Sequence, residues 1–218
     1  MKKLLATTFA ITTLSFVNIY AQQDFQLNGQ QIYTLGIGKK ADVQGTKYLN
    51  ENFILAKIDD YVKDFPLRYN AFDNEFEYKE NIASIIKLDK IYNKITFVTG
   101  QTFILIPYKD LNNNTKQEYI ELVHASGNIL FKTNKIKYIE AKEPVNGYDS
   151  AKPAKYLPAE SSYILKYKDQ YFEIPKKAKE LENLFPEKSN ELKSFIKSNK
   201  LKLDKEESLI KLAQFLNN

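Results

Sequence analysis

The chain has 218 residues, of which 32 are basic and 27 acidic, and it contains no cysteine. The lack of cysteine excludes a disulfide scaffold, a thiolate metal site and a cysteine nucleophile. Lysine supplies every basic residue but one and alternates with acidic residues, a pattern that argues against nucleic acid as a partner.

Residues 1–21 have the pattern of a secretory signal peptide. Lys2 and Lys3 precede an uncharged run that ends in the small residue Ala21. We expect cleavage between Ala21 and Gln22, which removes 21 of the 218 residues and leaves 197. The run is rich in threonine and barely reaches the roughly 20 residues of a spanning helix, so an uncleaved anchor is the less favoured alternative. The pattern predicts an exported protein, periplasmic or secreted, that meets a membrane only through this peptide before cleavage.

The next segments predict a lead-in followed by a β domain. Residues 22–49 are polar and contain four glycines, which predicts a loosely structured lead-in with a short strand near Gln31–Leu35. Across residues 50–173 alternate positions are apolar and short turns separate the runs, which is typical of antiparallel strands that pair with their sequence neighbours. We predict a twisted antiparallel β-meander or half-barrel, interrupted by a long loop with three prolines at 142–160.

The clearest predicted hairpin runs from Phe65 to Lys79, with Asp73 and Asn74 as a two-residue loop. In that register Arg68 faces Lys79 directly and reaches Glu77 on the diagonal. One face of the hairpin is then apolar and consists of Leu67, Tyr69, Ala71, Phe76 and Tyr78.

After Ile174 the apolar period changes from two to 3.6, which predicts three short helices in residues 174–218. Pro175 fits a first helical position, and Asp204 with Glu207 resembles a capping box that opens the third helix. Helices this short need packing against each other, the sheet or a partner. The predicted fold class is therefore α+β, a β-meander followed by three C-terminal helices.

Arg68 is the only arginine, so its position selects for the planar guanidinium. A structural clamp on a carboxylate or on backbone carbonyls is the default interpretation, and recognition of an anionic ligand is the alternative. Tyrosines gather around the long loop, where they either line a groove for a sugar or peptide or simply suit wet strand edges. The candidate ligand-binding residues are Arg68, Tyr69, Asn70, Tyr148 and Tyr156.

One turn carries the best metal candidate. Side-chain oxygens occupy positions 1, 3, 5, 9 and 12 of a calcium loop, namely Asp110, Asn112, Asn114, Glu118 and Glu121. Thr115 stands where such a loop needs glycine, so an asparagine-rich turn is the competing interpretation. His124 is the only histidine, and no Gly-x-Ser-x-Gly motif accompanies it, so neither a transition-metal site nor a Ser-His-Asp hydrolase is indicated. We predict no cofactor.

Two stretches carry a resemblance to a known family. They are Gly45-Thr46-Lys47-Tyr48-Leu49-Asn50-Glu51-Asn52-Phe53 and Leu67-Arg68-Tyr69-Asn70-Ala71-Phe72-Asp73-Asn74-Glu75-Phe76-Glu77. They resemble an uncharacterised family of exported Bacteroidota proteins with a Leu-Arg/Lys-Tyr-Asn strand, although that family has proline in place of Lys47. The resemblance implies an envelope location and a β-rich fold and assigns no catalytic residue. It also implies O-glycosylation at Ser150, within the triplet Asp149-Ser150-Ala151.

No motif in the sequence names a reaction. We therefore expect a soluble, non-enzymatic cell-envelope protein that binds a protein, a peptide or a glycan. A hydrolase of envelope polymers is the first alternative and would need a concave site with perturbed carboxylates or an activated nucleophile. A structural component of an outer-membrane assembly is the second.

Overall fold

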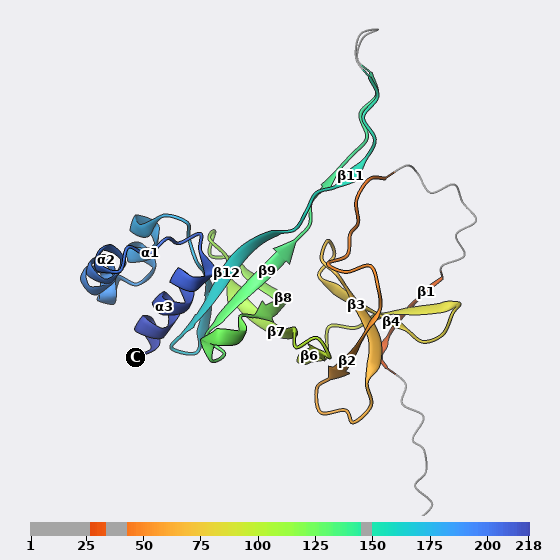
Figure 1. Cartoon of the computed structure of the whole chain (residues 1–218), viewed down its shortest axis with the longest axis horizontal. Coiled ribbons are helices and arrows are strands. Elements are labelled where there is room, and N and C mark those ends of the chain that lie inside the picture. The colour runs from red at the N-terminus through yellow and green to blue at the C-terminus, as the bar shows by residue number, and fades with distance from the viewer. Residues whose placement is uncertain (1–26, 34–42, 145–149) are drawn as a thin grey trace, which may run out of the picture.

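The computed structural model describes residues 27–33, 43–144 and 150–218 and confirms the predicted class, a mostly antiparallel sheet followed by three helices (Figure 1). The strands are β1 (Gly29–Tyr33), β2 (Ile54–Ile58), β3 (Phe65–Asn70), β4 (Glu75–Lys79), β5 (Ser84–Leu88), β6 (Lys94–Phe97), β7 (Thr102–Lys109), β8 (Thr115–Leu122), β9 (Leu130–Lys135), β10 (Tyr138–Ile139), β11 (Lys155–Tyr156), β12 (Glu160–Tyr167) and β13 (Gln170–Glu173). The helices are α1 (Ala178–Leu184), α2 (Ser189–Ser198) and α3 (Glu206–Asn217), with short 3-10 turns at His124–Ser126 and Pro186–Lys188.

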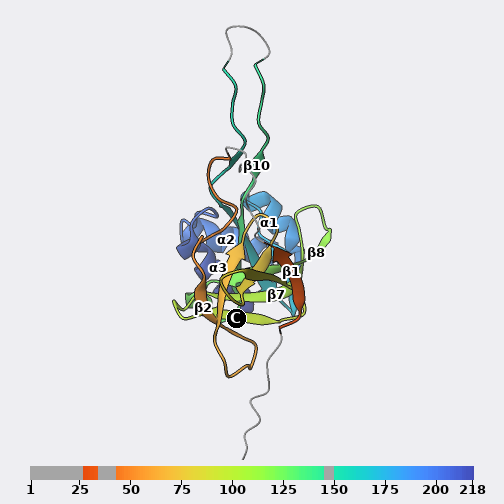
Figure 2. The same ribbon diagram turned by 90° about the vertical axis from the view of Figure 1, so that its right-hand side faces the viewer.

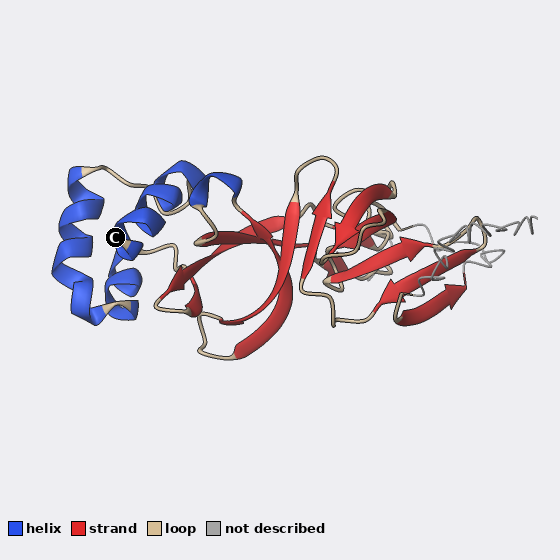
Figure 3. Ribbon diagram, turned by 90° about the horizontal axis from the view of Figure 1, so that it is seen from below, coloured by secondary structure: helices blue, strands red, loops and turns tan. Residues whose placement is uncertain are grey.

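Eleven strands form one sheet in the order β1-β5-β4-β3-β2-β6-β7-β13-β12-β9-β8. Sequence neighbours pair from β2 to β5 and from β6 to β9, as a meander requires, whereas β1 pairs with β5 and β6 pairs with β2. The contact between β13 and β7 is parallel and joins Phe172 to Lys109. Because β7 also pairs with β8, the strands β7, β13, β12, β9 and β8 close into a ring, which is not a barrel (Figure 3).

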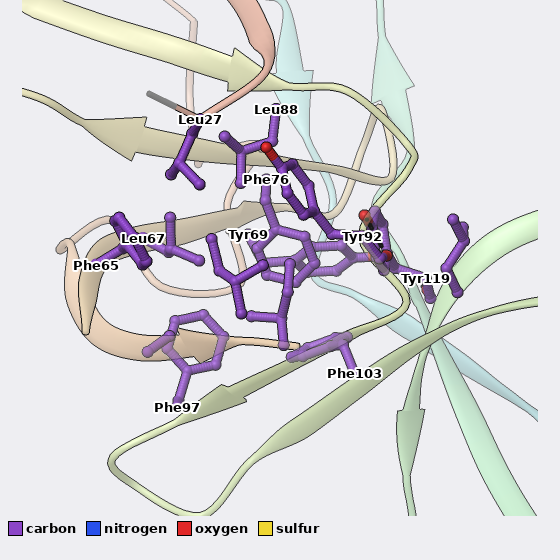
Figure 4. Packing of buried hydrophobic residues seen from close by; sticks show 14 of the residues in the cluster. Leu27, Phe65, Leu67, Tyr69, Phe76, Leu88, Tyr92, Phe97, Phe103 and Tyr119 are labelled. Carbon is purple, nitrogen blue, oxygen red and sulfur yellow. Dashed lines mark hydrogen bonds between the residues drawn. The ribbon is translucent and has the colours of Figure 1, made fainter. Parts of the chain in front are cut away.

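Three apolar clusters hold these parts together. Aromatic rings dominate the first, in the N-terminal part of the sheet, where the ring centroids of Tyr69 and Phe103 are 4.6 Å apart (Figure 4). All five ring strands contribute to the second, which consists of Ile106, Tyr108, Ile120, Phe131 and Ile164 with Tyr171 against it. The third joins the helices to the ring through Leu130, Leu165, Leu181, Leu192, Leu209 and Leu212. Burial of these side chains drives the packing of the three short helices on the sheet.

The helices begin at other residues than predicted. α1 begins at Ala178, three residues after Pro175, and α3 begins at Glu206. Lys205 is the N-cap of α3 and makes no side-chain capping bond, so the predicted capping box of Asp204 and Glu207 is wrong. The apolar stripe, not the cap, defines this helix, because its predicted residues are all buried, namely Leu209, Leu212, Ala213 and Leu216.

Part of the lead-in is ordered into the sheet. β1 begins at Gly29, two residues before the predicted strand, and pairs with β5 from Gly29 opposite Leu88 to Tyr33 opposite Ser84. Leu27, just before it, is only 4% exposed and packs into the N-terminal core.

The predicted loop at 142–160 contains most of one side of a two-stranded arm. β10 and β11 pair antiparallel, and Lys142 and Lys152 exchange two backbone hydrogen bonds of 2.9 Å farther out. Figures 1 and 2 show this arm extending away from the body of the molecule. The prolines that suggested a loop are accommodated because a two-stranded arm consists of edge strands, which tolerate proline.

Residues 43–52, here called the docking segment, connect the arm to the sheet. The Gln44 amide donates to Ala154 O (2.9 Å), and the Tyr156 amide donates to Gln44 O (2.8 Å). Farther along, the Leu49 amide donates to Tyr69 O on β3 (3.1 Å). The docking segment therefore ties the base of the arm to the edge of the β3–β4 hairpin.

Position 45 requires glycine, because the docking segment passes close to the backbone carbonyl of Tyr156 there. Its φ is +76°, and a Cβ added there would lie 2.6 Å from Tyr156 O. We expect Gly45→Ala to lower the free energy of unfolding by about 2–4 kcal/mol, because it combines backbone strain with a backbone clash. Gly127→Ala is the matched control, since Gly127 has φ +65° but open space around an added Cβ. Urea unfolding measures both, and equal losses would contradict the close approach at Tyr156.

Candidate functional site

The β3–β4 hairpin has a register two residues away from the predicted one. Arg68 pairs with Glu77, so it faces a carboxylate directly, and the prediction that it faces Lys79 is wrong. The shift of two residues leaves every side chain on its predicted face, because side chains alternate with a period of two.

The cause of the shift is Asn70. Its side-chain oxygen accepts the backbone amides of Phe72 (3.2 Å) and Asp73 (3.1 Å), and its Nδ2 donates to Asp73 Oδ2 (2.8 Å). This Asx-type arrangement replaces the predicted two-residue loop with a four-residue turn, 71–74.

Arg68 lies between two aromatic rings and holds Glu77. Its guanidinium carbon is 3.8 Å from the ring centroid of Tyr48 and 4.4 Å from that of Phe53. Its Nε and Nη2 both donate to Glu77 Oε2, at 2.7 and 2.5 Å. Ring stacking on both faces combined with two in-plane donors requires the planar arginine head and not a lysine ammonium.

Glu77 is 3% exposed, and several donors surround its carboxylate. The Tyr48 hydroxyl lies 3.1 Å from both carboxylate oxygens, and Lys47 Nζ is 3.5 Å from Oε1. Partners of this kind offset the cost of burying a charge. Burial, followed by the negative charge of Glu77, raises the pKa of Tyr48 well above its ordinary value. We call Tyr48, Phe53, Arg68 and Glu77 the arginine clamp.

Two other predicted ligand residues are internal. Tyr69 is 3% exposed and Asn70 is 2% exposed. Tyr69 packs in the aromatic core (Figure 4). Its hydroxyl oxygen accepts a hydrogen bond from Asn74 Nδ2 (2.7 Å). The structure therefore places Tyr69 and Asn70 largely beneath the surface, where they shape the hairpin.

Asn74 joins the hairpin to the ring. Its backbone is left-handed, with φ of 55°, a conformation that asparagine tolerates. Its side chain donates to Tyr119 O (2.9 Å) and accepts the Tyr119 amide (2.8 Å) on β8.

Beside this turn lies a group of three rings at the surface, Phe72, Tyr138 and the partly buried Tyr156, which we call the aromatic cluster. The ring centroids of Tyr138 and Tyr156 are 5.0 Å apart, and Phe72 is 5.6 Å from Tyr156. Phe72 and Tyr138 are 43% and 40% exposed. The cluster unites the hairpin turn with both strands at the base of the arm.

Tyr156 also lines a groove of about 520 Å³ beside the docking segment. Arg68 lines the same groove, so two of the predicted ligand residues do meet there. The other lining residues are Val43, Gly45, Thr46, Lys47, Tyr48, Glu51 and Asn52. Sequence reasoning missed Phe72, although a large apolar residue within a turn is itself a signal of surface contact.

The remaining predictions concern Tyr148 and the glycosylation triplet. Tyr148 lies outside the described residues, as does Asp149 of the predicted glycosylation triplet. Ser150 is described and exposed, and its modification stays a prediction.

The structure keeps three of the predicted calcium ligands in one turn, namely Asp110, Asn112 and Asn114, and places the two glutamates elsewhere. Asp110 Oδ1 accepts the amides of Asn112 and Asn114, both at 2.9 Å, and Asp110 Oδ2 contacts Lys116 Nζ at 3.0 Å. These contacts, led by the Asn114 amide, lower the pKa of Asp110 to about 2. The asparagine-rich turn is therefore the interpretation that the geometry supports.

The two glutamates of the calcium prediction lie on β8, away from this turn. Glu118 accepts a hydrogen bond from the Tyr108 hydroxyl (2.7 Å). Glu121 accepts one from Asn134 Nδ2 (2.6 Å) and is paired across the sheet with Phe103 at the far end of β7.

Within residues 27–33, 43–144 and 150–218, no group of three or more His, Cys, Asp or Glu side chains could hold a metal ion. None of the helices in that same part of the chain is both long and apolar enough to cross a membrane. No protein-family model, curated protein or solved structure matches the chain.

Replacing Arg68 tests the arginine clamp. We expect Arg68→Lys to lower the free energy of unfolding by about 1.5–3 kcal/mol, because the ammonium cannot stack on two rings while making two bonds to Glu77. Glu77→Gln should also destabilise, and the double variant should lose less than the sum of the two single losses. Urea unfolding gives all three values, and strictly additive losses would show that the two side chains are not coupled.

Alkaline titration tests the buried phenols. Burial raises the pKa of Tyr48, Tyr69, Tyr108 and Tyr119 well above 10, the value in the unfolded chain. Because the unfolded state loses these protons first, their contribution to stability is complete below pH 10 and declines as the pH rises above it. We expect ultraviolet titration to show that these four tyrosines ionise only when the protein unfolds. The Tyr48→Phe variant should have one fewer tyrosine in this late-ionising group. Ionisation of every tyrosine in the folded protein would contradict the burial.

Proposed function

We propose that the protein is an exported, non-enzymatic binding module of the cell envelope that engages a protein, peptide or glycan through the aromatic cluster. The signal-peptide pattern of residues 1–21 supports the location. The observation that carries the binding function is the gathering of Phe72, Tyr138 and Tyr156 on the surface from two distant parts of the sequence.

Exposed rings of this kind suit a binding surface. Each combines a large apolar area with little side-chain entropy to lose, and the two tyrosines add hydroxyl groups for hydrogen bonds. Contiguous exposed apolar area is kept on a protein surface mainly where something covers it.

The groove beside the docking segment extends this surface with polar groups. Tyr156 belongs to both, while Lys47, Glu51 and Asn52 supply charged and amide groups on the groove wall. Ligand sites commonly combine apolar area with a few polar groups that fix orientation.

The arginine clamp makes the site rigid. Tyr48 lies in the docking segment and Phe53 follows it directly, and both stack on Arg68, which Glu77 fixes to β4. A preformed wall costs less ordering entropy when a ligand binds. In this proposal the clamp is the support of the site and the rings of the aromatic cluster make the contact.

Removal of two rings tests the proposal. We expect the mature Phe72→Ala/Tyr138→Ala variant to bind host envelope fractions at least tenfold more weakly than the wild type, since an aromatic anchor contributes about 2 kcal/mol or more. Binding to peptidoglycan sacculi, outer-membrane vesicles and a glycan array would be measured separately, so that the ligand class follows from the fraction retained.

The matched control is Val62→Ala/Ile82→Ala, which removes two apolar side chains that are 97% and 95% exposed elsewhere. This control should bind as the wild type does. Equal loss in both double variants, or wild-type binding without the two rings, would refute the aromatic cluster as the binding surface.

A further inference from the structure

The groove beside the docking segment adjoins a second hollow. This hollow has a volume of about 300 Å³ and lies where the start of β2 meets the turn between β6 and β7. Asn52 and Arg68 line both the groove and the hollow, so the two share a wall. Of the two, Tyr156 lines only the groove, whereas Thr99 and Gln101 line only the hollow. Both volumes are of the size of ligand sites, roughly 300–1,000 Å³, so together they offer room for a ligand of several linked units.

The hollow has an apolar floor and a polar rim. Three residues of the N-terminal core form the floor, namely Leu67, Tyr69 and Phe97. The rim carries Asn52, Thr99 and Gln101, whose side chains form no hydrogen bond with any other residue that the structure describes. Amide and hydroxyl groups both donate and accept hydrogen bonds, so this rim can bind a ligand that does the same.

The charges along the groove and the hollow cancel. Lys47 and Arg68 supply two positive charges, and both contact Glu77. Glu51, which is exposed, supplies a second negative charge on the groove wall. Apart from Lys47, Glu51 and Arg68, the lining residues of both are uncharged. A wall without net charge selects neither an acidic nor a basic ligand, so a neutral ligand fits it best.

The backbone beside the groove is poorly suited to an extended peptide. A peptide that adds to a sheet needs a run of free amides and carbonyls along a strand. Within the docking segment the Leu49 amide already bonds to β3. The amides of Tyr48 and Asn52 bond to side chains two residues before them, at 3.3 and 2.9 Å. The docking segment therefore offers side-chain groups to a ligand more readily than a strand edge.

A neutral sugar chain matches these features. Its hydroxyl groups donate and accept, as the free groups of the rim do. The C–H faces of a sugar ring are apolar and pack on an aromatic ring such as that of Tyr156. Its linked units would extend from the groove into the hollow, which a single sugar cannot do.

We propose that the site binds a neutral oligosaccharide that runs along the docking segment, from the aromatic cluster at Tyr156 to the amides of Asn52 and Gln101. This inference rests on the proposed function, because the aromatic cluster receives one end of the chain. It selects one of the ligand classes of that proposal. The arginine clamp lies between the two ends and supports the site.

The test is calorimetric titration of the mature protein with neutral tetrasaccharides of glucose, galactose, mannose and N-acetylglucosamine. We expect at least one of them to bind, and the corresponding monosaccharide to bind at least tenfold more weakly. The affinity should be the same at low and high salt, because a neutral ligand has no charge to screen. We expect Asn52→Ala/Gln101→Ala to weaken binding about tenfold, since it removes hydrogen bonds at one end of the chain.

The matched control is Asn190→Ala/Gln214→Ala, which removes the same two kinds of amide from exposed positions of α2 and α3. This control should retain wild-type affinity, and equal weakening would overturn the role of Asn52 and Gln101. Failure of every tetrasaccharide to bind would overturn the inference. Tighter, Asn52-dependent binding of polygalacturonate or of an uncharged peptide would overturn the choice of a neutral sugar.

Failure of this inference is distinguishable from failure of the aromatic cluster. If Phe72→Ala/Tyr138→Ala loses binding to envelope fractions while no tetrasaccharide binds the wild type, the cluster stands and the sugar is refuted. If a tetrasaccharide binds and requires Asn52 and Gln101 but neither exposed ring, the cluster is refuted, together with the path that starts there.

Discussion

The ion pair between Arg68 and Glu77 is the interaction on which the rest of the site depends. It lies between two rings and is mostly removed from solvent, with the two side chains 16% and 4% exposed. A buried pair adds little net stability over an apolar replacement, but loss of one partner leaves a charge without compensation. Its effect is therefore mainly on geometry, because it fixes the docking segment, and through it the base of the arm, in one position on β4.

Asparagine side chains connect the β3–β4 hairpin to the ring of strands. Asn70 sets the turn of the hairpin, and Asn74 bonds to both backbone groups of Tyr119 in the manner of a strand partner. These bonds satisfy buried backbone groups where the sheet bends from its N-terminal part into the ring. The turn that they stabilise carries Phe72, so the position of the exposed ring follows from buried polar contacts.

The sequence predicted what depends on local periodicity and missed what depends on side-chain bonds. Strands, faces and the three helices follow from apolar repeats, and those predictions were confirmed. The hairpin register did not follow, because the turn signal of Asp73-Asn74 competes with the Asx bonds of Asn70. The clamp was predicted in kind from the single arginine. Its ring partners are Tyr48 of the docking segment and Phe53 just after it, and no local pattern reveals their contact with β3. The same limit applies to the pairing of β1 with β5 and of β6 with β2.

The residues of the arginine clamp come from two separate stretches of the sequence, 45–53 and 67–77. Tyr48 and Phe53 come from the first stretch, Arg68 and Glu77 from the second, and together they form the arginine clamp. The side chains of a structural support are constrained by packing on all sides, whereas the side chains of a ligand-binding surface are constrained by the ligand alone. The arm lies outside both stretches, and the exposed ring of Tyr138 is the feature of it that internal packing does not explain.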